Sequence, residues 1–351
     1  MDAVLTAMVE DRIGPGEYSR LLIQTAKESL RFDFALALRS PATALKLALT
    51  ALELEEGDGV LISALSPRYY SYVLSELRLT PLYCDVSFSF PCINRDSVEK
   101  ALAVVPGGIK PRCIVLHHTL GFVPDTASVA GLGFPIIEDI SQSFSHTSTD
   151  ETSVSAVGMA ETPGAGDSAQ TNKQVHGTFT ILGLEERDVL TSGGGALLFS
   201  VIRKDSAALK AQSNIPPEYC LPDINAALAA VQFRAAVRNL QKRNEIAKVY
   251  MQASLRTRHK RFVPLDGAEY NNYAFPLVLE TGVKDVTAYA RKKEIIIENA
   301  FEQSLAGAGI SDSVLCPVSY SLSLRTVLFP IYPRLPSRDV ERVSKLITTL
   351  P

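Results

Sequence analysis

The chain has 351 residues, 46% of them hydrophobic and 21% charged, which is enough apolar material for a sizeable core and excludes a wholly disordered protein. With 35 Lys and Arg against 38 Asp and Glu, the net charge of -3 gives neither a basic stripe for nucleic acid nor an acidic tail. No apolar run reaches the roughly 20 residues that a bilayer span needs, and the first residues do not resemble a signal peptide.

The five cysteines and five histidines favour neither a disulfide framework nor a metal site. The cysteines are scattered, odd in number and never spaced as CxxC. The adjacent His117 and His118 follow a predicted strand, where neighbouring side chains point to opposite faces, so they are not expected to share a metal ion. We therefore expect a cytoplasmic protein that binds no metal.

Hydrophobic periodicity predicts alternating helices and strands in the first part of the chain. Helices are predicted over 17–31, 41–54, 69–77 and 95–104, and short buried strands over 60–65, 82–86, 113–117 and from 135–137 into Asp139. This alternation indicates an α/β domain with a mostly parallel sheet. Asp139 lies at the strand end where such folds bind ligands, and its alternative role is the N-cap of a following helix.

The segment 145–176 interrupts the alternation. It contains no aromatic residue and is rich in Ser, Thr, Gly and Ala. Such a segment offers little apolar surface to offset the entropy of ordering it, so we expect a long mobile loop.

The rest of the chain predicts the end of the first domain and a smaller second one. Strands are predicted over 178–182 and 196–202, on either side of a glycine run at 193–195, and one long helix or two in series over 221–255. Beyond about residue 260, strands over 273–279 and 324–329 and helices over 283–293 and 337–350 indicate a smaller α+β unit. The expected organisation is a large domain over 1–245 and a small C-terminal domain over 246–351.

Seven segments, in order along the chain, carry a further pattern. They are SPATALKLAL (40–49), GDGVLIS (57–63), TPLYCDV (80–86), PIIEDISQS (135–143), TSGGGALLFS (191–200), LPDINAALAAVQ (221–232) with RNEIAKVYMQASL (243–255), and LFPIYPRLPSRDVERV (328–343). Together they resemble the DegT/DnrJ family of nucleotide-sugar aminotransferases. The resemblance implies the fold of pyridoxal-phosphate (PLP)-dependent transferases of the aspartate aminotransferase type. That fold has a mixed seven-stranded sheet, a small C-terminal domain, and a homodimer whose subunits complete each other's cofactor pockets.

The resemblance also implies which residues face PLP. Asp139 and Gln142 in EDISQ match the carboxylate beside the pyridine nitrogen and the glutamine beside the ring hydroxyl. Asp188 stands where the family has the lysine that holds PLP as a Schiff base, and a carboxylate cannot form that bond. Lys173, within 145–176, is the alternative, a relocated lysine.

The positions that resemble the family's phosphate-binding residues are altered as well. The family's Gly-Thr pair aligns with residues 41–42, and Ser40 and Thr43 supply the hydroxyls next to it. The serine before the lysine aligns with Gly183. The asparagine that the neighbouring subunit contributes aligns with Glu218, whose charge would repel a phosphate.

These substitutions predict a non-catalytic homologue, a binding or partner protein without a cofactor. Two alternatives stay open. One is an active PLP-dependent sugar aminotransferase that uses Lys173, and the other is a subunit that completes the active site of a paralogue. The expected partners are a second copy of the chain and a nucleotide-sugar, with no nucleic acid and no membrane.

Overall fold

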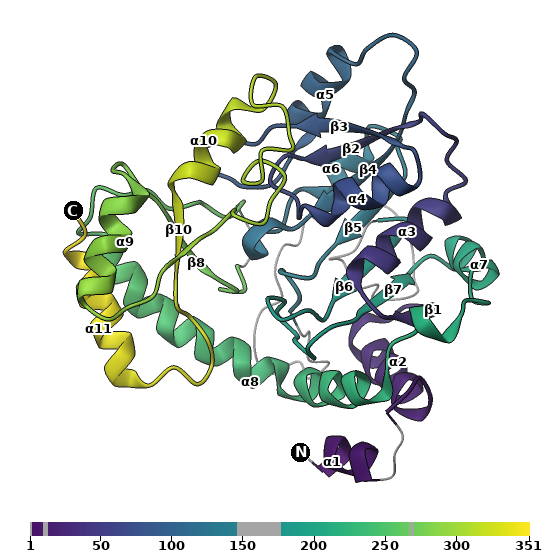
Figure 1. The fold of residues 1–351 in the computed structure, drawn as a ribbon, viewed down its shortest axis with the longest axis horizontal. Helices are drawn as coiled ribbons and strands as arrows, with labels where there is room; N and C mark the ends of the chain where they lie inside the picture. Colours follow the sequence, from purple (N-terminus) through teal and green to yellow (C-terminus); the bar gives the residue numbers. More distant parts are fainter. Residues whose placement is uncertain (1, 10–12, 146–176, 267, 269) are drawn as a thin grey trace, which may run out of the picture.

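The computed structural model describes residues 2–9, 13–145, 177–266, 268 and 270–351 (Figure 1). The predicted mobile loop, apart from residue 145, and Lys173 lie outside the described residues. Among the described helices, none combines the length and the apolar character that a membrane span requires.

Seven strands form the central sheet, in the order β1-β7-β6-β5-β4-β2-β3. They are β1 (Phe34–Leu38), β2 (Gly59–Ser63), β3 (Thr80–Cys84), β4 (Pro111–His117), β5 (Ile136–Asp139), β6 (Phe179–Gly183) and β7 (Ala196–Ser200). Strands β2 to β6 pair in parallel, whereas β7 is antiparallel to both β6 and β1. The predicted mixed, mostly parallel sheet is confirmed.

Helices cover both faces of this sheet because its strands are apolar on both faces. In β2, Val60 and Ile62 enter the core shared with α3, α4 and α7, and Leu61 enters the opposite core shared with α5 and α6. The helices of this part are α1 (Asp2–Val9), α2 (Glu17–Leu30), α3 (Pro41–Ala51), α4 (Tyr69–Glu76), α5 (Arg95–Ala103), α6 (Thr126–Ala130), α7 (Arg203–Ala211) and α8 (Asp223–Ser254).

A smaller unit follows, built on an antiparallel sheet in the order β8-β10-β9. Its elements are β8 (Phe275–Val278), α9 (Val283–Lys292), β9 (Glu298–Asn299), α10 (Pro317–Arg325), β10 (Thr326–Phe329) and α11 (Ser337–Thr348). Helices α9 and α11 and the second half of α8 form a separate core with β8 and β10.

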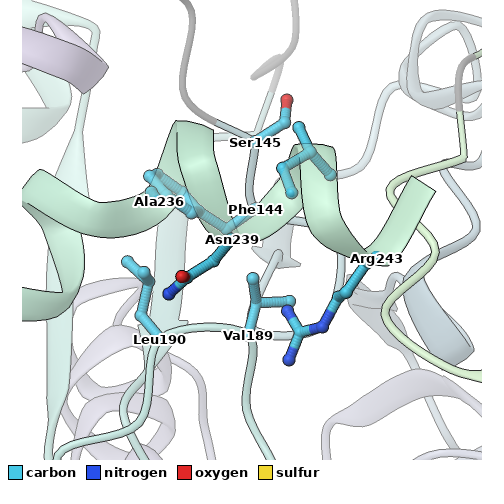
Figure 2. Close-up of a pocket in the computed structure, with 8 residues that line it drawn as sticks. Phe144, Ser145, Val189, Leu190, Ala236, Asn239 and Arg243 are labelled. Carbon is cyan, nitrogen blue, oxygen red and sulfur yellow. The ribbon is translucent and has the colours of Figure 1, made fainter. Parts of the chain in front are cut away.

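Helix α8 connects the two units as one uninterrupted helix (Figure 1). Phe233, in its first half, belongs to the core under the large sheet, and Tyr250 belongs to the core of the small unit. The domain boundary between residues 245 and 246 falls inside α8, and its position stays a prediction. The middle of α8 also borders a small pocket (Figure 2).

The structure adds α1, β1, α6, α7, β9 and α10 to the elements predicted from the sequence. Strand β1 completes the large sheet at its edge, where Phe34 pairs with Ser200 of β7. The strand predicted over 196–202 ends at Ser200, because Ile202 is already the N-cap of α7.

Candidate functional site

Asp139 ends strand β5 and has only 1% of its surface exposed. Its Oδ1 accepts hydrogen bonds from the backbone N–H of Ser141 at 3.1 Å and from the Ser141 hydroxyl at 2.5 Å, which is a local turn and not a helix cap. Its Oδ2 accepts hydrogen bonds from the hydroxyls of Tyr70 at 2.7 Å and Tyr69 at 3.3 Å. Because an ionised carboxylate has about four lone-pair sites, these four donors fill it.

The two tyrosines come from the first turn of α4. This helix follows β2, and β2 and β5 run parallel on either side of β4, so their carboxyl ends lie at one edge of the sheet. The rings of Tyr69 and Tyr70 meet edge to face, with 5.0 Å between their centroids. Burial raises the pKa of both phenols, and the charge of Asp139 raises it further, so both are protonated donors.

Asp188 lies beside this cluster, in the turn after β6. Its Oδ2 accepts a hydrogen bond from the backbone N–H of Glu185 at 2.8 Å. A Cβ added to Gly183 would lie 2.3 Å from that same oxygen and 2.8 Å from the Ser141 hydroxyl, so glycine leaves the room that the Asp188 carboxylate takes. Burial raises the pKa of Asp188, and the charge of Asp139 raises it as well. The two predicted site carboxylates are thus neighbours.

The predicted phosphate-binding residues at the start of α3 bond to one another. Ser40 is the N-cap of the helix, and its Oγ accepts a hydrogen bond from the backbone N–H of Thr43 at 3.2 Å. The two hydroxyl oxygens are 3.0 Å apart. Pro41, the first helical residue, has no N–H to offer an anion. Glu218 is exposed in a 3-10 turn (Pro217–Tyr219).

Gln142, predicted beside the ring hydroxyl of the cofactor, instead holds a turn of its own chain. Its side-chain Oε1 accepts a hydrogen bond from the backbone N–H of Leu120 at 2.7 Å. Its backbone carbonyl accepts one from the Asn271 amide at 2.8 Å. The Gln142 side chain is therefore committed to the turn after β4.

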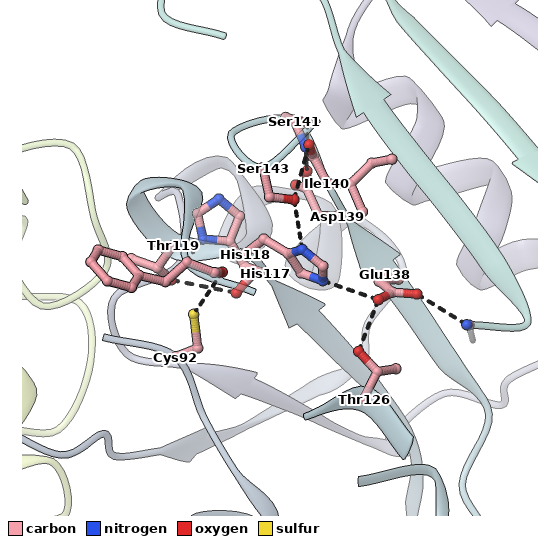
Figure 3. Close-up of polar contacts among 12 residues, drawn as sticks. Cys92, His117, His118, Thr119, Thr126, Glu138, Asp139, Ile140, Ser141 and Ser143 are labelled. Atoms are coloured by element: carbon pink, nitrogen blue, oxygen red, sulfur yellow. Dashed lines mark hydrogen bonds and ion pairs between the residues drawn. The ribbon is translucent and has the colours of Figure 1, made fainter. Parts of the chain in front are cut away.

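A second buried polar network lies where β4 and β5 end (Figure 3). The Nδ1 of His118 is 2.6 Å from the Ser143 hydroxyl, and its Nε2 is 3.0 Å from Oε1 of Glu138. The Thr126 hydroxyl donates to the same Glu138 oxygen at 2.9 Å, and the backbone N–H of Gly177 donates to Oε2 at 3.1 Å. These bonds hold α6 and Gly177, which lies just before β6, against the sheet.

His117, next in the chain to His118, takes different partners. Its Nδ1 is 3.0 Å from the Thr119 hydroxyl, and its ring meets that of Tyr70 edge to face at 6.3 Å. Burial lowers the pKa of His117 to about 4, so the imidazole is neutral near pH 7. Within the described ranges, no three His, Cys, Asp or Glu side chains are grouped to hold a metal ion.

Comparisons with known proteins now identify the family. The profile of the DegT/DnrJ/EryC1/StrS aminotransferase family matches residues 1–163 and 202–348. The chain belongs to this family. The stretch between the two matches, 164–201, includes β6 and the turn that carries Asp188.

Several solved structures share this fold. A DegT DnrJ EryC1 StrS aminotransferase from Brucella abortus has a TM-score of 0.80 and 17% identity, over 99% of this chain and 93% of its own. The aminotransferase TlmJ from Streptoalloteichus hindustanus has 0.78 and 18%, over 99% and 94%. The E. coli GDP-4-keto-6-deoxy-D-mannose-3-dehydratase, with bound hydrated PLP, has 0.76 and 12%, over 99% and 95%. The predicted PLP-transferase fold is confirmed.

The described residues of this DegT/DnrJ family member do not fit PLP. A carboxylate that keeps the pyridine nitrogen protonated needs a lone pair for the ring N–H, and the donors around Asp139 already take all of its lone pairs. The predicted lysine position carries Asp188. The helix start that would face the phosphate offers a proline and two hydroxyls that bond to each other.

Sequence reasoning missed Tyr69, Tyr70 and Ser141. The tyrosines read only as the beginning of a helix, and Ser141 as one small residue of EDISQ. The sequence does contain an indication that the tyrosines lie near Asp139. The two adjacent tyrosines begin the helix that follows a buried strand, and that strand ends at the same sheet edge as Asp139.

Proposed function

We propose that this chain is a non-catalytic member of the family, a binding or partner protein that forms no Schiff base with PLP. The observation that carries the proposal is the Asp139 carboxylate, which four donors of its own chain saturate. The Asp188 carboxylate against Gly183 supports it, because this pair replaces a lysine and a serine of the pattern that the sequence resembles.

The energies oppose PLP binding at this site. A ring nitrogen at Asp139 would have to displace a hydroxyl such as that of Tyr70, and a hydrogen bond to a buried charged group contributes about 1.5–3 kcal/mol. Two like unit charges 4 Å apart repel by about 4 kcal/mol at an effective dielectric constant near 20. A doubly charged phosphate facing Glu218 of a neighbouring subunit, as the resemblance places it, would meet more than that.

The ligand proposed for the binding role is a nucleotide-sugar. The support is the family itself, together with the name of the E. coli relative, which acts on a GDP-linked sugar. Binding of this kind needs no aldehyde and no lysine, so the substitutions at Asp188 and Gly183 do not oppose it.

The test is to titrate the purified protein with PLP, record the visible absorbance of an aldimine, reduce with borohydride and locate any adduct by peptide mass spectrometry. We expect no stoichiometric adduct. A stoichiometric adduct on Lys173 that Lys173→Ala removes would overturn the proposal and establish the relocated lysine. If the chain instead completes the pocket of a paralogue, native mass spectrometry of protein from its source would give a hetero-oligomer in which the adduct lies on the other subunit.

A further inference from the structure

Four cations lie close together in the segment that follows α8. Arg256, Arg258, Lys260 and Arg261 fall within six residues, and no other window of six residues in the sequence holds four Lys or Arg. All four side chains are exposed. The surrounding residues 246–265 contain no Asp or Glu. The net charge of -3 for the whole chain therefore conceals a local excess of positive charge.

The small sheet holds this segment in place. Lys260 and Val278, at the free edge of β8, exchange two backbone hydrogen bonds with N–O distances of 2.9 and 2.8 Å. His259 and Phe262, on either side of the central cations, are only 6% and 5% exposed. The two buried rings anchor the segment, so the cations are presented on a support that the sheet fixes.

Exposed aliphatic side chains stand at both ends of the run of cations. Leu255 is 68% exposed and Val263 is 61% exposed. The backbone N–H of Val263 donates to the carbonyl of Ser89 at 2.8 Å, which brings Val263 next to the loop that carries Phe88. The guanidinium of Arg325 lies over the Phe88 ring, 5.7 Å from its centroid. Cations and apolar side chains thus share this part of the surface.

The density of charge distinguishes this segment more than the pairing of its members. Glu280 forms an ion pair with Lys260 at 3.1 Å. Within the described ranges, Arg256, Arg258 and Arg261 have no ion pair, which is common for arginines of this chain. A single carboxylate against four cations leaves most of the local charge uncompensated.

We propose that residues 255–263, the basic surface, bind the anionic headgroups of a membrane surface. Clusters of about four to eight Lys and Arg are typical of segments that bind anionic lipids. Aliphatic side chains such as Leu255 and Val263 can enter the boundary between headgroups and acyl chains. Such contact needs no membrane span, so the lack of an apolar span in the sequence does not oppose it.

Nucleic acid fits the basic surface less well than lipid does. Single strands stack their bases on exposed aromatic rings, but His259 and Phe262 are buried and Arg325 covers Phe88. A duplex is bound at non-specific sites through its phosphates alone, which gives exposed aliphatic side chains no role. The aliphatic side chains at the ends of the run therefore favour lipid, and they provide a way to separate the two partners.

Flotation of the full-length protein with lipid vesicles tests the basic surface. The probes are vesicles of phosphatidylcholine alone and vesicles that contain about one third phosphatidylglycerol, whose headgroup is anionic. We expect the wild type to bind only the anionic vesicles at about 0.05 M salt and to be released at about 0.5 M salt, because salt screens exposed charges. Arg258→Gln with Arg261→Gln should weaken this binding by at least about tenfold.

The matched control is Arg203→Gln with Lys204→Gln. It removes two exposed cations next to the exposed Ile202, at α7, which Figure 1 shows at the opposite end of the molecule from the small unit. Binding to the anionic vesicles should stay within about twofold of the wild type. The substituted side chains are exposed, so an unchanged Tm confirms that each variant folds.

Leu255→Ser with Val263→Ser keeps every charge and should still weaken vesicle binding by about tenfold, because it removes the apolar contact. The inference is overturned if the wild type does not bind anionic vesicles, or if either the charge variant or the aliphatic variant binds them as the wild type does. Binding to a mixed-sequence DNA duplex without binding to vesicles would assign the surface to nucleic acid instead. Vesicle binding involves no PLP, so this inference and the proposed function can fail separately.

Discussion

Asp139 and Asp188 place two carboxylates in one buried cluster, and the surrounding side chains compensate for them in different ways. Asp139 accepts four hydrogen bonds from its own chain. Asp188 accepts one from Glu185 in the structure, and burial next to the Asp139 charge raises its pKa. The cluster is therefore stabilised by keeping one of its carboxylates fully bonded and the other more readily protonated.

Tyr70→Phe tests the bonding at Asp139. It removes the hydroxyl that donates to Asp139 at 2.7 Å and keeps the buried ring. The free energy of unfolding should fall by about 2 kcal/mol, because a buried charged acceptor loses a donor. Urea denaturation measures the change. Tyr72→Phe, at a side chain that is 67% exposed, is the matched control and should stay within about 0.5 kcal/mol of the wild type. Equal effects of the two substitutions would contradict the assignment.

His117 predicts a pH dependence of stability. Burial lowers its pKa to about 4 from an ordinary value of 6.5, so the unfolded chain binds this proton first as the pH falls. The contribution of His117 to stability is intact above about pH 6.5 and is lost as the pH decreases toward 4. Between pH 7.5 and 5 we expect a loss of about 2 kcal/mol from this residue.

His117→Asn isolates the effect, because asparagine can still bond to the Thr119 hydroxyl and does not titrate in this range. Urea unfolding of both proteins at several pH values should give a flatter profile for the variant. If the stability of the two proteins falls in parallel with pH, the pKa of His117 does not differ between the folded and the unfolded chain, and the prediction is wrong.

At the site, the sequence pattern placed Asp139 at a strand end, because it closes a buried apolar run. Asp188 was singled out only through the family resemblance. The pattern could not place Tyr69, Tyr70 or the role of Gly183 in the same way. Which side chains reach Asp139 depends on how α4 packs against the sheet, and that packing is set by the core as a whole.

Among the secondary-structure elements, α2 depends on a cap from far along the chain. No side chain at its N-cap, Gly16, caps the helix. Instead the Asp223 carboxylate, at the start of α8, accepts hydrogen bonds from the backbone N–H groups of Gly16, Tyr18 and Ser19 and from the Ser19 hydroxyl, all at 2.9–3.0 Å. Its charge also suits the positive end of the α2 dipole. One residue therefore fixes how α2 meets α8.

Asp223→Ala should lower the free energy of unfolding by about 3 kcal/mol, since it leaves several donors at a helix end without a partner. Chemical denaturation followed by circular dichroism measures it. Asp285→Ala removes an exposed first-turn carboxylate of α9 and should change stability by less than about 0.5 kcal/mol. A loss at Asp223 no larger than that at Asp285 would contradict the capping role.

The sequence could predict some of the secondary-structure elements and not others. The parallel strands were found because they are continuous apolar runs buried on both faces, such as residues 60–62 in β2. Strand β1 was missed because five apolar residues suit a strand or a helix, and its antiparallel partner, β7, comes much later in the chain. Long-range caps such as Asp223 leave no local signature at all.

On the scale of the whole molecule, several exposed apolar side chains fall between residues 5 and 21. Leu5, Met8, Val9, Ile13 and Leu21 are between 38% and 85% exposed. Helices α1 and α2 both pack on α8 (Figure 1). The first residues of α8 belong to the LPDINAALAAVQ segment, which the family resemblance implies lies near the subunit contact. We propose that α1 and α2 pair with a second copy of the chain, because their exposed apolar side chains would be covered there and they pack beside the segment that the resemblance implies at the subunit contact.

The dimer can be tested by multi-angle light scattering at micromolar concentration, where we expect twice the 38.1 kDa mass of one chain. Replacing Met8 and Val9 together by glutamate should give the monomer mass, because two like charges would face each other across a two-fold contact. The matched control is Ile296→Glu, at an 81% exposed residue of the small unit, which should leave the dimer intact. A wild-type monomer would refute the dimer, and a dimer that survives the Met8 and Val9 substitutions would place the interface on another surface.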